Sequence, residues 1–547
     1  MNDKRMTAPL MDALEQYKHK KQASMHVPGH KNGASYRQWA ACTTGKAKER
    51  YDAFASFLAY DVTEVDGTDD LHQPEGAIQE AQELAAACFG AEETHFLIGG
   101  STVGNLAAIL TCCTKQNDLV IVQRNVHKSI LNGLRMAGAR AVFISGREDK
   151  RTGLISGPPV EVIREALERY PMAKAVIVCN PNYYGMGIDL KPVAEVVHHY
   201  GVPLIVDEAH GAHYGLHPQL PHSALQTGAD LVIQSTHKML TSMTMSAMLH
   251  VQGDRVDRQR LKKMLMMLQS SSPSYPLMAS LDLTRYWIDQ RGSTWLESGL
   301  YAAEQVRQAA KQSPMWGILD VSDDSEASAR GTSTSGYSSG FDTLDPFKLV
   351  LWDKIGRLSG FELLDKLQSA GVVAEMADPV HVVLIMTLSD TTEEADRVIR
   401  CLKQVEQEQC LHDFASPSSI EHTEDSCAPY RSCQDMLQSS EAVYDMKDQS
   451  VFAQLTISEP VRFTLFEEDR QVITLPVEQI EGYEAAEAVV PYPPGIPIII
   501  QGERLTARHI TLLQQLAAAG AKCQEVTDKH LRTLKVCASP HNSQGNS

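Results

Sequence analysis

The sequence predicts an α/β fold, with a mostly parallel sheet in a large domain and a smaller α/β domain toward the C-terminal end. Between about residues 94 and 250, short runs rich in Val, Ile and Leu alternate with longer helix-like stretches. Strands that are apolar on both faces and separated by helices are typical of a parallel sheet covered on both sides. A chain of 547 residues is also too long for one compact domain.

The elements of the large domain follow in order along the chain. We expect helices at 103–115, 159–170 and 191–200, among others, and strands at 94–98, 119–122, 141–144, 175–179, 203–206, 231–233 and 247–251. Ligands of such sheets bind at the carboxyl ends of the strands. The polar candidate residues fall at those ends: residues 99–102, 180–183, 207–210 and 235–238.

The later chain predicts a smaller domain interrupted by polar segments. We expect helices at 392–408 and 507–519 and strands at 346–351, 380–388, 453–457 and 496–500, whereas 322–339 and 415–440 are polar loops or insertions. The predicted domains are an N-terminal arm and active-site cap (1–75), a large domain (76–310), the first part of a small domain (311–410), a polar linker (411–450), a C-terminal domain (451–536) and a disordered tail (537–547).

Composition excludes several classes of protein. The formal charge of -18 argues against a nucleic-acid partner and against a polybasic membrane patch. No run approaches the roughly 20 apolar residues of a membrane span, and the first residues contain no apolar signal core. The 11 cysteines contain no CxxC pair and are odd in number, so neither a zinc framework nor a secretory disulfide set is indicated. We expect a cytoplasmic protein without a metal site.

Lys238 and Asp207 are the most informative residues. Lys238 follows a predicted strand in the run Ser-Thr-His-Lys-Met-Leu, and Asp207 directly follows the apolar run of the strand before it. Pyridoxal 5'-phosphate needs a lysine for the Schiff base and a buried carboxylate that keeps its ring nitrogen protonated. A surface lysine and a helix-capping aspartate are the alternatives. The sequence therefore predicts a pyridoxal phosphate enzyme.

Further polar residues are candidates for the same site. Ser101 and Thr102 open a helix after a glycine pair, and such a helix start binds phosphate, although an ordinary N-cap uses the same residues. Ser235 and His237 flank the lysine and could complete the phosphate site. His127 lies between a strand and a helix, where its ring could stack on a pyridine ring or be merely structural.

His210 lies three residues after Asp207 and is a candidate proton donor at the cofactor's other edge. The segments HVPGHK at 26–31 and DDLH at 69–72 are dense in polar residues and could cap an active site, possibly that of a neighbouring subunit. Plain polar loops are the alternative there, and the histidine spacing matches no zinc pattern.

Several motifs together resemble the Orn/Lys/Arg decarboxylase family, over most of the chain outside the two polar insertions and the tail. They are HVPGHK at 26–31, DDLH at 69–72, GST at 100–102, RNVHKS at 124–129, VDEAHGAH at 206–213, STHKML at 235–240, SSSPSY at 270–275, PYPPGIP at 491–497 and GE at 502–503. The resemblance implies a fold-type-I pyridoxal phosphate enzyme, aspartate aminotransferase-like, of the shorter bacterial branch without a wing domain.

By this resemblance Lys238 would hold the cofactor, Asp207 would pair with the ring nitrogen and His127 would stack on the ring. Ser101, Thr102, Ser235 and His237 would hold the phosphate. Ser271 belongs to the run of serines at 270–272 that looks like the family segment reaching a partner subunit's phosphate. A homodimer or higher homo-oligomer is therefore expected.

The expected activity is decarboxylation of a basic amino acid, with arginine first and lysine or ornithine next. One departure concerns Tyr483, which stands where longer family members carry an arginine before the PYPPG motif. It leaves the substrate preference open. Two other functions also stay open: a different pyridoxal phosphate reaction, such as transamination or β-elimination, and a non-catalytic regulatory relative.

Overall fold

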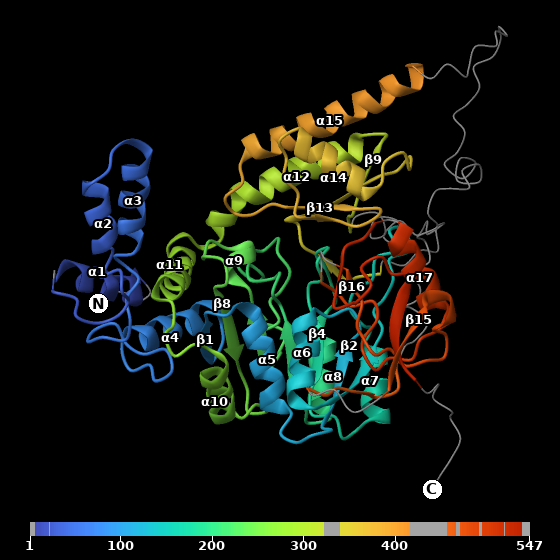
Figure 1. Cartoon of the computed structure of the whole chain (residues 1–547), viewed down its shortest axis with the longest axis horizontal. Helices are drawn as coiled ribbons and strands as arrows, with labels where there is room; N and C mark the ends of the chain where they lie inside the picture. Colours follow the sequence, from blue (N-terminus) through green and yellow to red (C-terminus); the bar gives the residue numbers. More distant parts are fainter. Residues whose placement is uncertain are drawn as a thin grey trace.

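The computed structural model describes residues 6–20, 22–321, 340–415, 457–465, 471–491, 495–518 and 520–538. The polar segments at 322–339 and 416–440, and the strand expected at 453–457 apart from Ile457, lie outside these ranges. Figure 1 shows three helices of the N-terminal arm at one side, the large sheet in the middle, a small domain above it and the C-terminal part beside it. Within the described residues, no helix has the length and apolarity that crossing a membrane requires.

The large sheet has eight strands in the order β1-β8-β7-β6-β4-β2-β3-β14. The five strands β7, β6, β4, β2 and β3 pair in parallel, and β1, β8 and β14 add antiparallel edges. The predicted mostly parallel sheet is therefore confirmed. The strands are β1 (Glu93–Leu97), β2 (Leu119–Gln123), β3 (Arg140–Ile144), β4 (Val176–Cys179), β6 (Leu204–Asp207), β7 (Leu231–Gln234), β8 (Ala247–Val251) and β14 (Val461–Arg462).

Helices cover both faces of this sheet. Alternate residues of β2 enter two separate hydrophobic clusters, Leu119 and Ile121 on one face and Val120 and Val122 on the other. The first face packs against α4 (Ala77–Phe89), α7 (Val160–Arg169), α8 (Leu190–His199) and α11 (Tyr275–Arg291), and the second against α5 (Gly100–Cys112), α6 (Lys128–Ala137) and α10 (Arg258–Leu268). Gly104 lets α5 approach the sheet closely, because a Cβ there would lie 2.8 Å from Ile233 and Leu97 atoms.

The small domain is a four-stranded antiparallel sheet in the order β12-β13-β11-β9, with helices packed against it. It includes most of the strand expected at 346–351 and the centre of the one expected at 380–388. Its elements are α12 (Glu297–Gln312), β9 (Trp316–Ile318), β11 (Lys348–Asp353), α14 (Gly360–Ser369), β12 (Met376–Ala377), β13 (Val382–Ile385) and α15 (Thr392–Ala415). A short ribbon of β10 (Thr343–Leu344) and β5 (Met186–Gly187) ties the small domain to the large one.

The C-terminal part has its own hydrophobic cluster. Its elements are β15 (Val472–Pro476), the 3-10 helix η4 (Val477–Gln479), β16 (Val490–Pro491), α17 (Ala507–Ala518), β17 (Cys523–Gln524) and β18 (Thr533–Cys537). The predicted strand at 496–500 is wrong, because only an isolated bridge between Ile499 and Val489 forms there. Pro497 lacks the amide that a regular ladder needs. β18 also includes Cys537, where the disordered tail was expected to begin.

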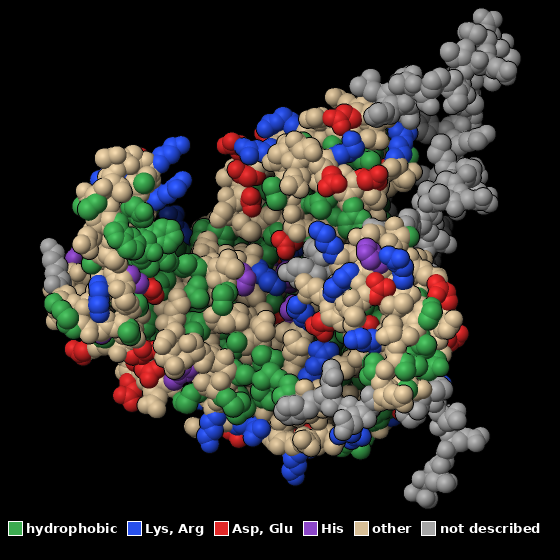
Figure 2. Space-filling model, viewed as in Figure 1, with side chains coloured by type: hydrophobic (Ala, Val, Ile, Leu, Met, Phe, Trp, Pro, Cys, Tyr) green, Lys and Arg blue, Asp and Glu red, His purple; other side chains and the backbone are tan. Residues whose placement is uncertain are grey.

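The N-terminal arm consists of α1 (Pro9–His19), α2 (Ala34–Ala41) and α3 (Gly45–Phe57). A buried ion pair of α11 fixes α1: Asp282 accepts the Leu10 amide at 2.9 Å, and Arg285 donates to Thr7 O at 2.7 Å. The hairpin of α2 and α3 stands away from the body, and apolar side chains gather on it (Figures 1 and 2). Trp39 and Phe54 are about half exposed there.

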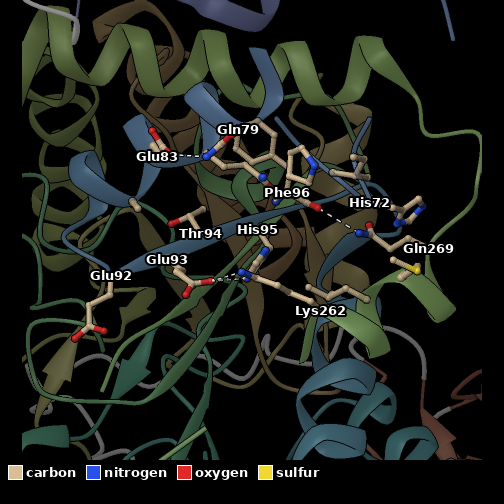
Figure 3. A pocket seen from close by; sticks show the side chains of 16 residues that line it. His72, Gln79, Glu83, Glu92, Glu93, Thr94, His95, Phe96, Lys262 and Gln269 are labelled. Carbon is tan, nitrogen blue, oxygen red and sulfur yellow. Dashed lines mark hydrogen bonds and ion pairs between the residues drawn. The ribbon is translucent and has the colours of Figure 1, made fainter. Parts of the chain in front are cut away.

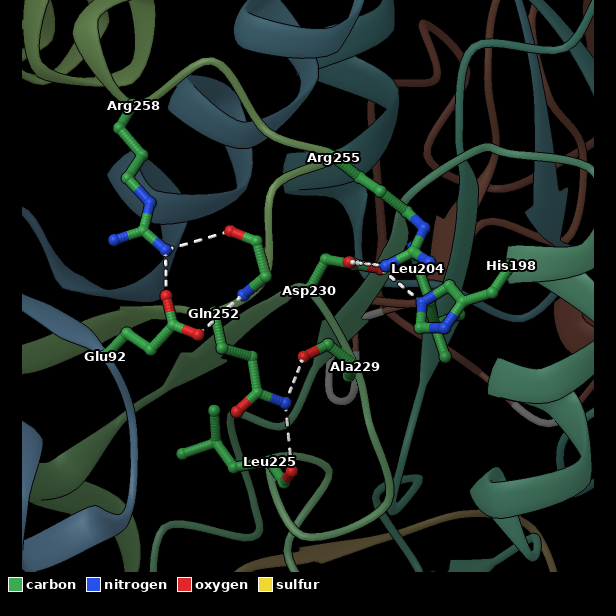
Figure 4. Close-up of polar contacts among 10 residues, drawn as sticks. Glu92, His198, Leu204, Leu225, Ala229, Asp230, Gln252, Arg255 and Arg258 are labelled. Carbon is green, nitrogen blue, oxygen red and sulfur yellow. Dashed lines mark hydrogen bonds and ion pairs between the residues drawn. The ribbon is translucent and has the colours of Figure 1, made fainter.

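The amino ends of the strands are held by a polar network around the buried Asp230 (Figure 4). Its carboxylate accepts hydrogen bonds from the Leu204 amide at 2.8 Å and from His198 Nε2 at 2.8 Å, and it pairs with Arg255 at 3.3 Å. Because the network joins β6, β7, α8 and the loop after β8, it fixes the sheet at the end opposite the carboxyl ends of the parallel strands.

The outer edge of β1 is covered by two glutamines. Gln82 of α4 accepts the Phe96 amide at 2.8 Å. Gln269 accepts the Ile98 amide at 2.9 Å and donates to Phe96 O at 3.3 Å. Both side chains line a cavity of about 320 Å³ beside the strand, in which Figure 3 shows Gln269 next to Phe96. Residues on α4 and after α10 thus replace the neighbouring strand that β1 lacks.

Candidate active site

The candidate residues converge at the carboxyl ends of β6 and β7. Asp207 is the last residue of β6 and pairs in register with Ile233 of the parallel strand β7. One turn of helix, α9 (Thr236–Met239), follows β7 and carries Lys238. Figure 2 shows Lys, Arg and His side chains gathered where the large domain, the small domain and the C-terminal part meet.

Lys238 is partly buried and contacts two rings. Its Nζ lies 3.0 Å from His210 Nε2 and 5.5 Å from the centre of the Tyr183 ring. Burial lowers the pKa of Lys238, although the carboxylates of Asp207 and Glu375 act in the opposite direction. The amine is therefore more readily neutral, and more nucleophilic, than that of a surface lysine.

Asp207 is a buried carboxylate held by neutral donors. Its side chain is 2 % exposed, Oδ2 accepts from Asn105 Nδ2 at 2.9 Å, and Oδ1 accepts the Ala209 amide at 3.1 Å. Within the described ranges no ion pair joins it to a cation. A buried carboxylate without a cation is costly, so this position suits a cationic group of a ligand.

His127 lies in the loop between β2 and α6, where its Nδ1 accepts the Ser129 amide at 3.2 Å. Ser129 also accepts a hydrogen bond from Asn105, the residue that holds Asp207. Burial lowers the pKa of His127 and favours a neutral, flat imidazole. Asn105 thus links the positions of His127 and Asp207.

The four predicted phosphate residues occupy two adjacent segments. Ser101 and Thr102 are in the first turn of α5, whose N-cap is Gly99, so the alternative of an ordinary Ser/Thr N-cap is wrong. The Gly100 amide donates to Met245 O at 2.9 Å, and His237 Nδ1 lies 2.9 Å from Ser246 O. The neighbouring acceptors Met245 and Ser246 bring the start of α5 beside α9. The hydroxyls of Ser235, the N-cap of α9, and of Thr236, its first residue, are buried and have no hydrogen-bond partner among the described residues.

Ser271 lies apart from this cluster, exposed in the loop between α10 and α11. The preceding residue, Ser270, offers its carbonyl to His72 Nε2 at 2.8 Å. The loop therefore contacts the predicted cap segment of the same chain. A role for Ser271 at a partner subunit's phosphate stays a prediction.

The cap motif at 69–72 has a structural role. Asp69 adopts a left-handed backbone conformation, with φ 68°, and its carboxylate accepts five backbone amides at the start of α4, those of Asp70, Glu75, Gly76, Ile78 and Gln79. Burial opposes ionisation of Asp69, but these hydrogen bonds lower its pKa overall. Asp69 therefore fixes where α4 begins.

The motif at 124–129 also binds the C-terminal part. The buried Arg124 donates to Pro497 O and Ile498 O, both at 3.0 Å, and pairs with Glu503 at 2.8 Å. Lys128 donates to Gln524 at 2.7 Å. The loop that carries His127 is thus fixed by a segment nearly 400 residues later, as the distance in sequence between Lys128 and Gln524 shows.

Four residues of the site were not assigned a role from the sequence. Asn105 holds Asp207, and the Tyr183 ring lies 4.3 Å from that of His210. The fully buried Lys348 of β11 has its Nζ 3.1 Å from His210 Nδ1. Glu375, before β12, acts electrostatically on both lysines and is exposed. Tyr183 lies in a predicted strand-end segment, but nothing local in the sequence distinguishes the other three.

Comparison with known families gives two matches along the chain. Residues 8–394 match the model of the Orn/Lys/Arg decarboxylase major domain, and residues 460–526 match that of the Orn/Lys/Arg decarboxylase C-terminal domain. The two matches leave out the whole of the predicted linker between them.

Similar proteins agree with these matches. An uncharacterized protein of Bacillus subtilis, YaaO, is 35% identical over 93% of this chain and 94% of its own length. An arginine decarboxylase of Bacillus subtilis is 31% identical over 96% of this chain and 97% of its own length. The solved structure of the constitutive lysine decarboxylase of E. coli superposes with a TM-score of 0.72 at 19% identity, over 97% of this chain and 82% of that one. The last likeness confirms the fold class.

Proposed function

Because the chain belongs to the Orn/Lys/Arg decarboxylase family, it is a decarboxylase of basic amino acids, and we propose that arginine is its preferred substrate and pyridoxal 5'-phosphate its cofactor. The single observation that supports the cofactor best is the arrangement around Lys238: an amine of lowered pKa, a buried carboxylate with neutral donors and no ion pair among the described residues, and two buried hydroxyls without a partner there. The support for arginine is the likeness, over nearly the full length of both chains, to an arginine decarboxylase.

The residues fit this cofactor group by group. Lys238 would bind its aldehyde, Asp207 its ring nitrogen, and His127 one face of its ring. Ser235 and His237, with Ser101 and Thr102 at the start of α5, would hold its phosphate, which the buried unpaired Ser235 hydroxyl suits. When bound, the cofactor supplies an electron-poor ring that accepts the electron pair of the bond between Cα and the carboxylate.

The side chains around that ring perform the remaining tasks. Asp207, oriented by hydrogen bonds from Asn105 and the Ala209 amide, would stabilise a positive charge on the ligand's ring nitrogen. Lys238 and His210 are within hydrogen-bond distance of each other, so either side chain can return a proton to the substrate's α-carbon. The Tyr183 ring lies 4.3 Å from the His210 ring and 5.5 Å from Lys238 Nζ, where it would shield both side chains from water on one side.

Glu375 is the acid we propose for the substrate's distal guanidinium. It is exposed at the small-domain side of the site, and its charge acts on both Lys238 and Lys348. A carboxylate binds a guanidinium through two parallel hydrogen bonds. Glu375→Gln should therefore raise KM for arginine more than it lowers kcat, and equal loss of both would contradict this role.

We also propose that the chain acts as a homodimer or larger homo-oligomer. Two surfaces support this: the loop that carries Ser271, which is exposed beside the cap segment, and the hairpin of α2 and α3 with its half-exposed Trp39 and Phe54. Light scattering on the purified chain measures the mass directly. A stable monomer at micromolar concentration that retains full activity would contradict the proposal.

The experiment that tests the activity is an equimolar mixture of arginine, lysine and ornithine with purified, cofactor-loaded protein. We expect agmatine and CO2 to form first, and Lys238→Ala to abolish both. Keto acids or ammonia would indicate transamination or elimination instead. Absence of every amine product would favour a regulatory relative, whose other role should survive Lys238→Ala.

A further inference from the structure

Lys348 and Lys238 approach the two nitrogens of one imidazole. His210 Nε2 lies 3.0 Å from Lys238 Nζ, and His210 Nδ1 lies 3.1 Å from Lys348 Nζ. Lys348 is fully buried and comes from the small domain, whereas Lys238 and His210 belong to the large one. A buried lysine is rare unless it is paired, and the proposed reaction assigns Lys348 no part.

The protein holds the Lys348 side chain in place. Gly185 has a φ of 83°, and a Cβ added there would lie 2.7 Å from both Cβ and Cγ of Lys348. The Asp345 amide donates to Gly185 O at 2.9 Å, which fixes the turn before Lys348. Asp345 itself is buried and binds His213 Nε2 at 3.0 Å. The path of Lys348 toward His210 is therefore enforced from several sides.

The number of protons on the three groups in this row, Lys348, His210 and Lys238, limits which protonation states allow both hydrogen bonds. A neutral imidazole carries one N–H, so one ring nitrogen donates and the other accepts. An ammonium group can only donate, so a neutral imidazole cannot bind two ammonium groups. If both contacts are hydrogen bonds, the amine on the N–H side must be neutral and must accept through its lone pair.

Charges near the row place the ammonium on Lys348. The carboxylates that act on it are those of Asp345 and Glu375, and one Asp345 oxygen is buried with no hydrogen-bond partner in the part of the chain that the structure describes. Burial lowers the pKa of Lys348 to about 8, so it is mostly protonated at neutral pH. Burial and the two lysines, with His127 and His237, hold the pKa of His210 well below its usual range. The imidazole is therefore neutral.

We propose that Lys348 is a positioning residue for Lys238 and acts through His210. Its ammonium donates to Nδ1, which leaves the ring proton on Nε2, so Lys238 Nζ must accept that proton's hydrogen bond with the lone pair of a neutral amine. The arrangement prepares Lys238 for attack on a carbonyl carbon. This inference rests on the proposed function only for its purpose, since the protonation state of Lys238 is measurable without any reaction.

The test measures how readily Lys238 is acetylated in the full-length chain without added cofactor. A trace of acetic anhydride is added to samples between pH 6 and pH 11. Mass spectrometry then measures the acetylated fraction of Lys238 relative to that of the exposed Lys46, which serves as internal standard. Lys348→Met removes the donor at nearly the same size, and Lys348→Arg keeps a permanent donor. We expect Lys348→Met to raise the apparent pKa of Lys238 by about one unit, which makes acetylation at pH 8 about tenfold slower. Lys348→Arg should restore the wild-type profile.

A second comparison does not depend on the arginine variant fitting beside Gly185. We call the two hydrogen bonds that join Lys348 to Lys238 through His210 the relay. A His210→Phe background already lacks both bonds, so adding Lys348→Met there should change the pH profile of Lys238 acetylation no further. Equal shifts in both backgrounds, or an unchanged profile in Lys348→Met, would refute the relay. If Lys238 titrates as expected but no amino acid is decarboxylated, the proposed function fails and the relay stands. If amino acids are decarboxylated but the Lys238 profile does not change, the relay fails and the proposed function stands.

Discussion

Replacing Arg124 tests whether the C-terminal part holds the loop that carries His127. Arg124→Met removes a side chain that donates to Pro497 O and Ile498 O and pairs with Glu503. The side chains of the pair are only 8% and 17% exposed, so the contact is not a surface ion pair of negligible energy.

The magnitude follows from these contacts. Each lost hydrogen bond to a carbonyl costs about 1 kcal/mol, and breaking a mostly buried ion pair costs about 3 kcal/mol. After the substitution, Glu503 still accepts the Ile500 amide at 3.0 Å and stays partly exposed to water, which reduces the total free-energy cost. We therefore expect local opening to become easier by about 3 kcal/mol, which corresponds to roughly 100-fold faster amide exchange.

Hydrogen exchange followed by mass spectrometry measures this effect in peptides that cover residues 123–130 and 495–505. Arg135→Met is the matched control, because Arg135 also reaches the C-terminal part, at 3.4 Å from Glu525, but both side chains are more exposed. Its effect should stay within about threefold. Unchanged exchange in Arg124→Met, or an equal effect of the two variants, would refute the argument that Arg124 joins the loop to this part of the chain.

Three further changes give separate tests. Asp207→Asn should remove the charge that faces the ligand's ring nitrogen and lower kcat at least about 1000-fold. Absorbance measures whether the variant retains the cofactor. Near-normal turnover would contradict the role of Asp207. Burial raises the pKa of Glu208 to about 8, against its hydrogen bonds from Gln234, Ala224 and Ser223. Its pKa in the folded state thus exceeds the ordinary value of 4.5. The wild type should therefore lose stability as pH rises through about 8. In Glu208→Gln, the urea midpoint should depend less on pH between pH 5 and 9. Asp69→Ala should destabilise the fold by about 2 kcal/mol and lower the urea midpoint, because the amides at the start of α4 lose their acceptor. Asp69→Asn tolerates the same φ and should lower the midpoint less. Equal midpoints for the wild type and both variants would exclude the capping role.

Much of the large domain could be predicted, because strands buried on both faces leave a strong pattern in the sequence. Lys238 and Asp207 could be placed at one edge of the sheet for the same reason, since Asp207 follows an apolar run directly and Lys238 follows the next one after four polar residues. Lys348 could not, because it reaches His210 from another domain, 110 residues after Lys238 in this numbering. Asn105 gave no signal, because a single amide side chain in a mostly apolar helix does not indicate what it binds.

The strand predicted at 496–500 shows a different kind of failure. Its apolar run Ile498-Ile499-Ile500 is typical of a strand, but Ile498 and Ile499 are buried in the cluster of the C-terminal part, and Ile500 is buried in the cluster on the second face of the large sheet. Apolar composition predicts burial more reliably than it predicts backbone pairing, and here the proline before the run decided the backbone.

Gln82 and Gln269 bear on whether the protein aggregates at high concentration. A sheet whose outermost strand offers free amides and carbonyls is a template onto which a foreign strand can add, and the product grows into aggregates. Here the amide and carbonyl of Phe96 on β1, and the amide of Ile98 just after it, are already occupied by the two glutamines. Shortening both side chains to alanine would expose the template while leaving Lys238 and its neighbours untouched, and the cost would appear as turbidity before any loss of turnover.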